Sequence, residues 1–174
     1  MDRKTLKDHV WLEVAFALAK LGTCARRKVG AVFLDKRGRV VSSGYNGVAP
    51  DLPHCTENPC SGAGCPSGTG LELCEAIHAE QNALAQLRDI DGVHTVYCTD
   101  SPCIHCIKML ATTGAHRIVF ARAYPHSASE DYWKRRGGLW EHVPYKPPTQ
   151  EVTAPPRAIT RFRGWLSNWL RRMG

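Results

Sequence analysis

The sequence has 174 residues, eight cysteines and a formal net charge of +7 at pH 7. This length is typical of one domain with a full hydrophobic core. No apolar run at the N-terminus resembles a signal peptide and no stretch reaches transmembrane length, so we expect a cytoplasmic protein that keeps its cysteines reduced. Five arginines and no acid lie in residues 157–174, which leaves only +2 for the rest of the chain. We therefore expect no nucleic-acid partner for the main body.

Apolar periodicity and turn residues predict helices and strands in the order α-β-β-α-β-α-β-α-β. The expected helices cover residues 5–21, 71–90, a segment that starts beside Cys103, and 129–136. The expected strands cover residues 29–35, 39–45, 94–99, 116–121 and 139–143, and a long loop covers 46–70. This order predicts an α/β fold with a mixed five-stranded sheet, helices on both faces and a parallel last pair of strands.

The chain divides into a domain at 1–143, a linker at 144–156 with five prolines, and a basic amphipathic helix at 157–174. The apolar stripe of this last helix consists of Ile159, Phe162, Trp165, Leu166, Trp169, Leu170 and Met173. We interpret the stripe as a surface that packs on the domain or on a sister subunit. A membrane-surface or partner-binding helix is the alternative.

Two short motifs carry the chemistry. His78 and Glu80 lie two residues apart, and Cys103 and Cys106 form a Cys-x-x-Cys pair. One histidine and two cysteines are three ligands for a tetrahedral Zn²⁺ and leave its fourth position for water, which is the pattern of a catalytic site. Because two residues along a helix turn the side chain by roughly 200°, His78 and Glu80 cannot bind one ion side by side. We therefore expect His78 to hold the metal near the start of a helix and Glu80 to act as the base.

Helix-capping residues flank both motifs. Thr5 and Asp8 read as a capping box for the first helix. Ser101 reads as an N-cap and Pro102 as the first residue of the helix with the two cysteines, whose opening turn would favour the thiolate form. A structural zinc or a redox pair is the alternative for a Cys-x-x-Cys with a distant histidine. A structural site would need a fourth protein ligand and gives no reason for Glu80.

His-x-Glu followed by Pro-Cys-x-x-Cys is the signature of zinc-dependent deaminases, and the chain resembles their deoxycytidylate (dCMP) deaminase family. The matching segments are TCARRKVGAV at 23–32, GYNG at 44–47, PSG at 66–68, ELC at 72–74, HAEQNA at 78–83, SPCIHC at 101–106, KML at 108–110 and RIV at 117–119. They cover about residues 5–125 in the family's order. The resemblance implies a three-layer α/β/α cytidine-deaminase-like fold and the hydrolysis of dCMP to dUMP and ammonia, which feeds thymidylate synthesis.

The resemblance also implies roles for single residues. Glu80 would take a proton from water, pass it to N3 of the cytosine ring and help to protonate the leaving amine. Asn46 would contact the sugar, with a purely conformational turn residue as the alternative. By residue type, Arg26 or Arg27 could bind the 5′-phosphate with a bidentate fork, with a solvated loop arginine as the alternative for either one. The remaining candidates for substrate contact are Ser101, Ala79 and Tyr124, and Asn82 is a candidate to orient the site.

Further expectations concern regulation and a second metal. The resemblance suggests a homohexamer activated by dCTP and inhibited by dTTP, with an effector site, often with Mg²⁺, beside Gly44, Tyr45 and Gly47. Cys24, Cys55, Cys60 and Cys74 lie where similar sequences carry cysteine, and His54 is adjacent, so we expect a structural zinc there. Cys65 is a departure from the family pattern and is either a replacement ligand or a free thiol. Cys98 is expected in the core and His105 in solvent.

Three rival functions stay open. Within the same class, the substrate could be dCTP or a modified deoxycytidine nucleotide, because loop geometry sets the number of phosphates. A nucleic-acid-editing deaminase guided by the arginine-rich tail predicts strongly salt-dependent binding to single strands. A non-enzymatic zinc module predicts metal content without turnover.

Overall fold

A computed structural model describes residues 1–66, 68–124 and 127–147 of the chain. The helices are α1 (Arg3–Ala19), α2 (Ala79–Ala85), α3 (Ile104–Leu110) and α4 (Ser127–Arg135), and a short 3₁₀ turn, η1, covers Leu71–Leu73. The strands are β1 (Gly30–Leu34), β2 (Val40–Tyr45), β3 (Thr95–Asp100), β4 (Arg117–Arg122) and β5 (Leu139–His142). Within these residues, the structure holds no helix with the length and hydropathy of a membrane span.

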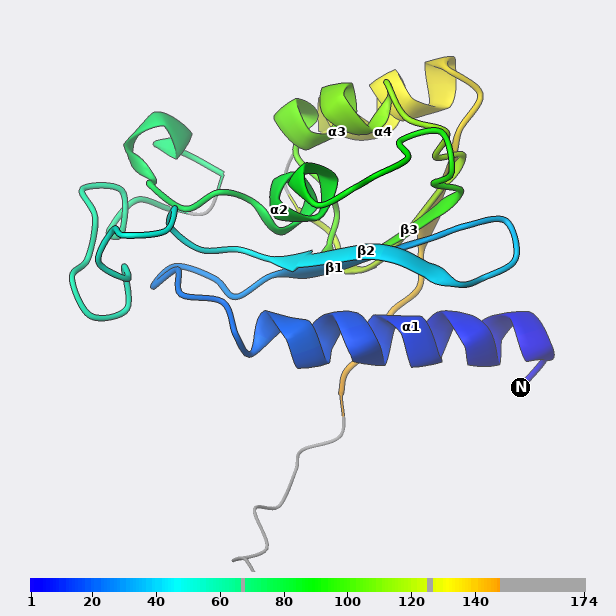
Figure 1. The fold of residues 1–174 in the computed structure, drawn as a ribbon, viewed down its shortest axis with the longest axis horizontal. Helices are drawn as coiled ribbons and strands as arrows, with labels where there is room; N and C mark the ends of the chain where they lie inside the picture. Colours follow the sequence, from blue (N-terminus) through cyan, green and yellow to red (C-terminus); the bar gives the residue numbers. More distant parts are fainter. Residues whose placement is uncertain (67, 125–126, 148–174) are drawn as a thin grey trace, which may run out of the picture.

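The five strands form one mixed sheet in the order β2-β1-β3-β4-β5. Strand β1 is antiparallel to both of its neighbours, whereas β3, β4 and β5 run parallel. Figure 1 shows α1 on one face of the sheet and α2, α3 and α4 on the other. The predicted three-layer α/β/α fold and its parallel last pair of strands are therefore confirmed.

Successive side chains of the central strand β1 belong to two hydrophobic clusters, one on each face of the sheet. Ala31 and Phe33 of β1 belong to the cluster under α2, α3 and α4, whereas Val32 and Leu34 belong to the cluster under α1. Successive strand residues point to opposite faces, so a strand covered by helices on both sides must be apolar at every position. All five residues of β1 are buried.

Two glycines of the β1–β2 hairpin let helices approach the sheet from both sides. A Cβ atom at Gly30 would lie 2.0 Å from the carbonyl oxygen of Ala15 in α1. A Cβ atom at Gly44 would lie 2.3 Å from the carbonyl oxygen of Ala79, in the first turn of α2. Only residues without a side chain fit these contacts, and the second one places the beginning of α2 against β2.

The predicted helix at 71–90 is wrong in both of its boundaries. Only η1 and α2 are helical there, and α2 begins after His78, its N-cap residue. The reason is tertiary: Ile77 exchanges two backbone hydrogen bonds with Gly47, and this bridge holds the chain before His78 in an extended conformation.

Both predicted N-caps are also wrong. The Asp2 side chain caps α1 by accepting hydrogen bonds from the backbone N–H groups of Lys4 and Thr5. Asp8 lies within α1 and is buried. Helix α3 begins two residues later than expected, with Cys103 as its N-cap. Ser101 and Pro102 belong instead to the buried connection between β3 and α3.

The described chain ends beyond β5. The ring of Tyr145, within the predicted linker, lies 5.4 Å from the ring of His9 and 5.8 Å from that of Phe16 in α1, centroid to centroid. The predicted amphipathic helix at 157–174 and most of the linker lie outside the described residues.

Candidate active site

Three ligand atoms meet where α2 and α3 begin. The Nδ1 atom of His78 lies 3.5 Å from Sγ of Cys103 and 3.3 Å from Sγ of Cys106. Among the described residues these three side chains are the only group of at least three metal-ligating residues whose ligand atoms all lie within 4.8 Å of one another. The structure thus brings together the three side chains that the sequence predicts as zinc ligands.

The spacing of the triad fits zinc. Zn–N bonds of about 2.0–2.1 Å and Zn–S bonds of about 2.3 Å at a tetrahedral angle place nitrogen and sulfur about 3.5 Å apart. Both His78 contacts have this length within a few tenths of an ångström. The Gln81 side chain accepts a hydrogen bond from the backbone N–H of His78, which fixes the turn that presents the imidazole.

The mutual hydrogen bond shifts the pKa values of the two thiols in opposite directions. A hydrogen bond from Cys106, together with the proximity of His78, lowers the pKa of Cys103 to about 3 against the effect of burial. The same hydrogen bond and burial raise the pKa of Cys106 well above its usual value. Zinc binds cysteine as the thiolate, so both thiols would give up their protons to the bound metal.

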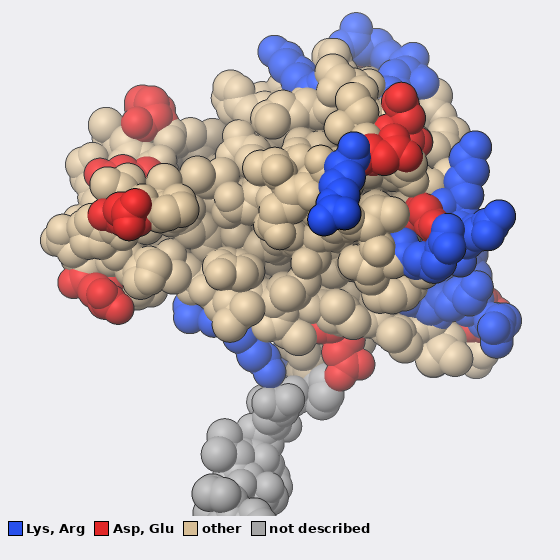
Figure 2. Space-filling model, in the orientation of Figure 1, with Lys and Arg blue, Asp and Glu red and all other residues tan. Residues whose placement is uncertain are grey.

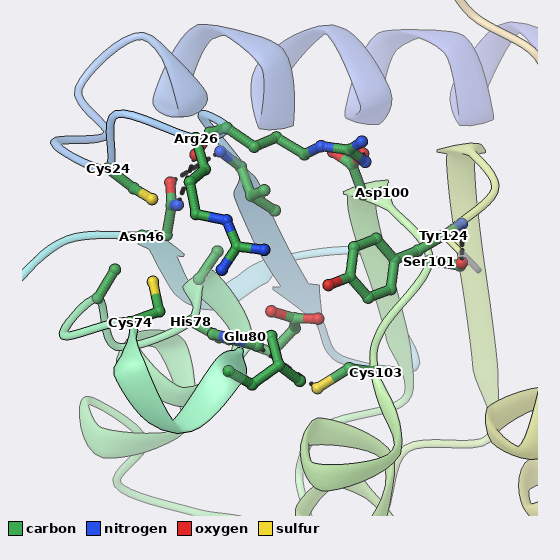
Figure 3. Close-up of a pocket in the computed structure, with 15 residues that line it drawn as sticks. Cys24, Arg26, Asn46, Cys74, His78, Glu80, Asp100, Ser101, Cys103 and Tyr124 are labelled. Atoms are coloured by element: carbon green, nitrogen blue, oxygen red, sulfur yellow. Dashed lines mark hydrogen bonds and ion pairs between the residues drawn. The ribbon is translucent and has the colours of Figure 1, made fainter. Parts of the chain in front are cut away.

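Glu80 lies in the first turn of α2, and only 4% of its surface is exposed. Burial raises the pKa of its carboxyl group to about 7. A group with a pKa near the working pH both accepts and donates protons readily, which is the requirement for general acid–base catalysis. In Figure 3 the Glu80 carboxylate points into a pocket that His78 and Cys103 also line.

This pocket encloses about 620 Å³ of space, which includes open solvent at its mouth. Besides the zinc-site residues it is lined by Cys24, Arg26, Arg27, Val29, Asn46, Leu71, Cys74, Ala76, Ala79, Asp100, Ser101 and Tyr124. Every predicted substrate-contact residue therefore lines the same pocket as His78 and Cys103, namely Asn46, Ser101, Arg26, Tyr124 and Ala79.

Asn46 connects the pocket to the segment before β1. Its Oδ1 accepts a hydrogen bond of 2.8 Å from the Val29 N–H, and its Nδ2 donates one of 2.7 Å to the Arg27 carbonyl. Ser101 has a similar supporting contact, because its Oγ accepts a 2.7 Å hydrogen bond from the Tyr124 N–H. Both side chains thus hold the backbone of other pocket residues, and their contact with substrate stays a prediction.

Asp100 is the pocket residue that sequence reasoning missed. It ends β3, is 3% exposed, and forms ion pairs with Arg27 and Arg122. An acid at the end of an apolar strand, directly before the Ser-Pro-Cys motif, was the available signal. Its partners lie 73 and 22 residues away along the chain, so the sequence alone does not identify them.

The other four expected zinc ligands form two pairs. The Sγ atoms of Cys55 and Cys60 lie 3.6 Å apart, and burial together with the proximity of Cys24 and Cys60 raises the pKa of Cys74. No three of these ligand atoms lie as close together as the His78 group does in the described chain. The second zinc therefore stays a prediction.

Other predicted residues are placed as follows. Cys98 is fully buried and His105 is exposed, as predicted, whereas His54 is exposed and Cys65 is partly buried. Asn82 donates a 2.8 Å hydrogen bond from Nδ2 to the Tyr45 carbonyl and so joins α2 to β2. Gly44 is buried under α2 and Gly47 pairs with Ile77, and nothing in these contacts tests an effector site.

An α/β/α sheet with one histidine, two cysteines and a buried glutamate at the helix starts defines the class of zinc-dependent deaminases. The chain belongs to the cytidine and deoxycytidylate deaminase family, since the model of the family's zinc-binding region matches residues 5–122.

Similar proteins carry related names. Deoxycytidylate deaminase of Saccharomyces cerevisiae is 32% identical over 119 residues, 67% of this chain and 38% of that protein. Deoxycytidylate deaminase of Mycobacterium phage D29 is 36% identical over 122 residues, 66% of this chain and 94% of that protein. A crystal structure of dCMP deaminase from the cyanophage S-TIM5, in complex with dCMP and dUMP, superposes with a TM-score of 0.62 and 25% identity, and covers 81% of this chain and 98% of that one.

The chain thus spans well under half of the yeast relative and nearly all of the phage D29 relative.

Proposed function

We propose that this chain is a zinc-dependent deaminase that hydrolyses dCMP to dUMP and ammonia. The observation that carries the proposal is the convergence of the ligand atoms of His78, Cys103 and Cys106 at a pocket into which the buried Glu80 points (Figure 3). The names of the phage D29 relative and of the cyanophage structure with dCMP and dUMP support the choice of substrate. In the cell the product would supply thymidylate synthesis in the cytoplasm, where free cysteines such as the eight of this chain persist.

His78, Cys103 and Cys106 would hold the zinc, whose Lewis acidity makes water nucleophilic near neutral pH. Glu80 takes one proton of the attacking water and gives it to N3 of the cytosine ring. As the bond between C4 and the amino nitrogen breaks, Glu80 transfers the second proton of the water to the departing amine, which leaves as ammonia, and C4 keeps the water oxygen as a carbonyl. The pKa of Glu80, which burial raises to about 7, suits both transfers.

The pocket walls would hold the rest of the nucleotide. Asn46 would contact the sugar, Ser101 and Ala79 the base through their backbone, and Tyr124 the base or sugar by stacking. Arg26 would meet the phosphate or support the loop that covers it. All five line the pocket.

The first test is ammonia release and uracil-nucleotide formation from dCMP, dCTP, deoxycytidine and a single-stranded DNA oligomer in parallel. We expect turnover of dCMP well above that of the other three. Equal or faster turnover of dCTP would indicate that the enzyme is a dCTP deaminase. Turnover of the oligomer alone, or no turnover of any free nucleotide, would overturn the proposal.

The charges on one face of the molecule do not favour a polynucleotide substrate. On the face that Figure 2 shows, Lys and Arg side chains lie in separate groups, the larger ones at the side of the β1–β2 hairpin and at the top over α3 and α4, and Asp and Glu side chains lie over the long loop before α2 and among the basic groups. No continuous basic groove formed by the described residues crosses this face (Figure 2). A single-strand channel would need a continuous basic groove that leads to the catalytic residues.

Regulation is a further part of the proposal. We propose activation by dCTP and inhibition by dTTP, with Mg²⁺, at a site beside Gly44, Tyr45 and Gly47 in a homohexamer. The catalytic domain would be residues 1–143, and the tail helix at 157–174 would pack on a neighbouring subunit. Initial rates with each triphosphate and the mass in solution by light scattering test this. A monomer with rates that neither triphosphate changes would refute it.

A structural zinc at Cys24, Cys55, Cys60 and Cys74 is proposed as well. The 3.6 Å separation of the Cys55 and Cys60 sulfur atoms is close to the ~3.8 Å expected between two thiolates on one tetrahedral zinc. We expect two zinc ions per chain by elemental analysis. Cys60→Ser should release one of them, and Cys65→Ser, at a cysteine outside the set, should release none. One zinc per wild-type chain would exclude the second site.

A further inference from the structure

The Gln81 side chain contacts both helix starts that supply the zinc ligands. Its Oε1 accepts a 2.9 Å hydrogen bond from the backbone N–H of His78, and its Nε2 donates a long hydrogen bond of 3.9 Å to Sδ of Met109 in α3. Met109 follows Cys106 by three residues and so lies on the same side of α3. Gln81 therefore joins the backbone of one ligand to the helix that carries the others.

His78 has a backbone that needs such a partner. As the N-cap residue of α2 it is extended, with φ −69° and ψ 155°, and its N–H lies outside the helical ladder. The bridge between Ile77 and Gly47 holds the chain on the side before His78. The hydrogen bond to Gln81 holds it on the side of the helix, so that the backbone is fixed from both directions.

The imidazole position depends on this backbone. Its Nδ1 lies 3.5 Å and 3.3 Å from the sulfur atoms of Cys103 and Cys106, and a rotation of the chain at His78 would change both distances. Without Gln81, the partly buried N–H would be left without its acceptor, which favours such a rotation. Removing one side chain would therefore move one ligand away from the other two.

The neighbouring polar side chains of α2 hold a different element. Asn82 and Gln86 donate hydrogen bonds of 2.8 Å and 3.2 Å to the carbonyls of Tyr45 and Ser43 in β2. These contacts attach α2 to the edge of the sheet, whereas the contact of Gln81 is directed to α3. The helix thus uses separate side chains to hold its place on the sheet and to align the triad.

We propose that Gln81 is a positioning residue that sets how tightly His78, Cys103 and Cys106 retain zinc. The inference rests on the proposed function, which takes these three residues as the zinc site, and it assigns control of metal retention to a side chain that touches neither metal nor substrate. Residues that support metal ligands typically change metal affinity by about 10- to 100-fold when they are lost.

The first experiment measures the rate at which the zinc-loaded protein releases zinc to an excess of a chromogenic chelator. For Gln81→Leu we expect release roughly 10- to 100-fold faster than for the wild type. Gln81→Glu should restore slow release, because a glutamate at this position of a helix accepts the same hydrogen bond from the N-cap backbone. Release at the wild-type rate from Gln81→Leu, or equally fast release from both variants, would overturn the proposal.

Gln86→Leu is the matched control. Gln86 lies on the same helix and also makes two hydrogen bonds, to the carbonyls of Ser43 and Asn82. This variant should release zinc at the wild-type rate, although it should lower the urea midpoint of the metal-free protein about as much as Gln81→Leu does. Equally fast release from Gln86→Leu and Gln81→Leu would mean that loosening of α2 alone causes the loss, and would refute the positioning role.

The geometry of the triad can be measured with cobalt(II) in place of zinc, because the visible absorption of cobalt depends on its coordination geometry. We expect the spectrum of Gln81→Leu to differ from that of the wild type, and the spectra of Gln81→Glu and Gln86→Leu to match it. Identical spectra for the wild type and Gln81→Leu would contradict the proposal.

Neither measurement needs turnover, which separates this inference from the deaminase proposal. If the wild type deaminates no nucleotide but Gln81→Leu alone loses zinc rapidly, the deaminase proposal fails and the role of Gln81 stands. If the wild type deaminates dCMP and Gln81→Leu releases zinc at the wild-type rate, the role of Gln81 fails and the deaminase stands.

Discussion

At the scale of single residues, Glu80 carries the sharpest prediction. Glu80→Gln keeps the shape and hydrogen-bonding capacity of the side chain but cannot transfer protons. We expect turnover to fall by roughly 10²- to 10⁴-fold, while zinc content by elemental analysis stays unchanged, because Glu80 is not among the three close ligand atoms.

The matched control is Glu57→Gln, at an exposed position of the long loop, which should change neither quantity. A Glu80→Gln protein that keeps its activity would remove the assigned role. If the wild type has no activity and Glu80→Gln loses its zinc, the chain would be a non-enzymatic metal module.

The residues whose role follows from their spacing could be predicted, and those whose role follows from long-range contacts could not. His78, Cys103 and Cys106 are identified by residue type and interval alone. The pairing of Arg27 with Asp100 bridges 73 residues, and only the folded sheet brings the two together. Ser101 shows the same limit, because its hydroxyl accepts from the Tyr124 backbone instead of capping a helix.

At the scale of elements, Gly44 positions the helix that carries the catalytic residues. Gly44→Ala would place a methyl group 2.3 Å from the Ala79 carbonyl oxygen, so α2 must move away from β2. We expect a loss of about 1–3 kcal/mol in the free energy of unfolding, measured by urea denaturation. We also expect a lower kcat/KM, because His78 and Glu80 move with the first turn of α2.

Gly64→Ala is the control for Gly44→Ala, since a Cβ atom there has no neighbour within 4 Å. It should leave stability and activity near wild-type values. A Gly44→Ala protein as stable and active as the control would show that α2 does not depend on this close approach.

The order of the elements could be predicted because apolar periodicity and turn residues are local signals. The start of α2 could not, because the bridge between Ile77 and Gly47 overrides a sequence that favours helix from residue 71. This error matters for function: the extended chain before His78 makes that residue the N-cap and so turns its imidazole toward the cysteines.

At the scale of the whole molecule, one polar network joins the α1 layer to the sheet. Asp8 in α1 is 2% exposed. It receives a 2.7 Å hydrogen bond from the Tyr97 hydroxyl on β3 and two of 2.8 Å from the Arg117 guanidinium on β4. Arg117 also pairs with Glu141 on β5. The buried charges are thus compensated within the network, so removing one member leaves its partners unpaired.

This network makes stability depend on pH. Burial raises the pKa of Asp8, but hydrogen bonds from Arg117 and Tyr97 outweigh it, so the net pKa is below the ordinary 3.8. A carboxyl with a lowered pKa in the folded state stabilises the protein fully above its unfolded pKa and loses that contribution as pH falls through the folded value. Asp8→Asn should therefore cost about 3 kcal/mol at pH 7, and its difference from the wild type should shrink below about pH 4.

Urea denaturation of both proteins from pH 7 to pH 3 measures this difference. Asp131→Asn is the control, because Asp131 forms an exposed pair with Arg135 on α4 and such pairs contribute little. A constant difference between wild type and Asp8→Asn across this range would mean that the Asp8 charge does not stabilise the fold. In that case the attachment of α1 to the sheet would rest on its apolar contacts, centred on Leu12 and Ala15.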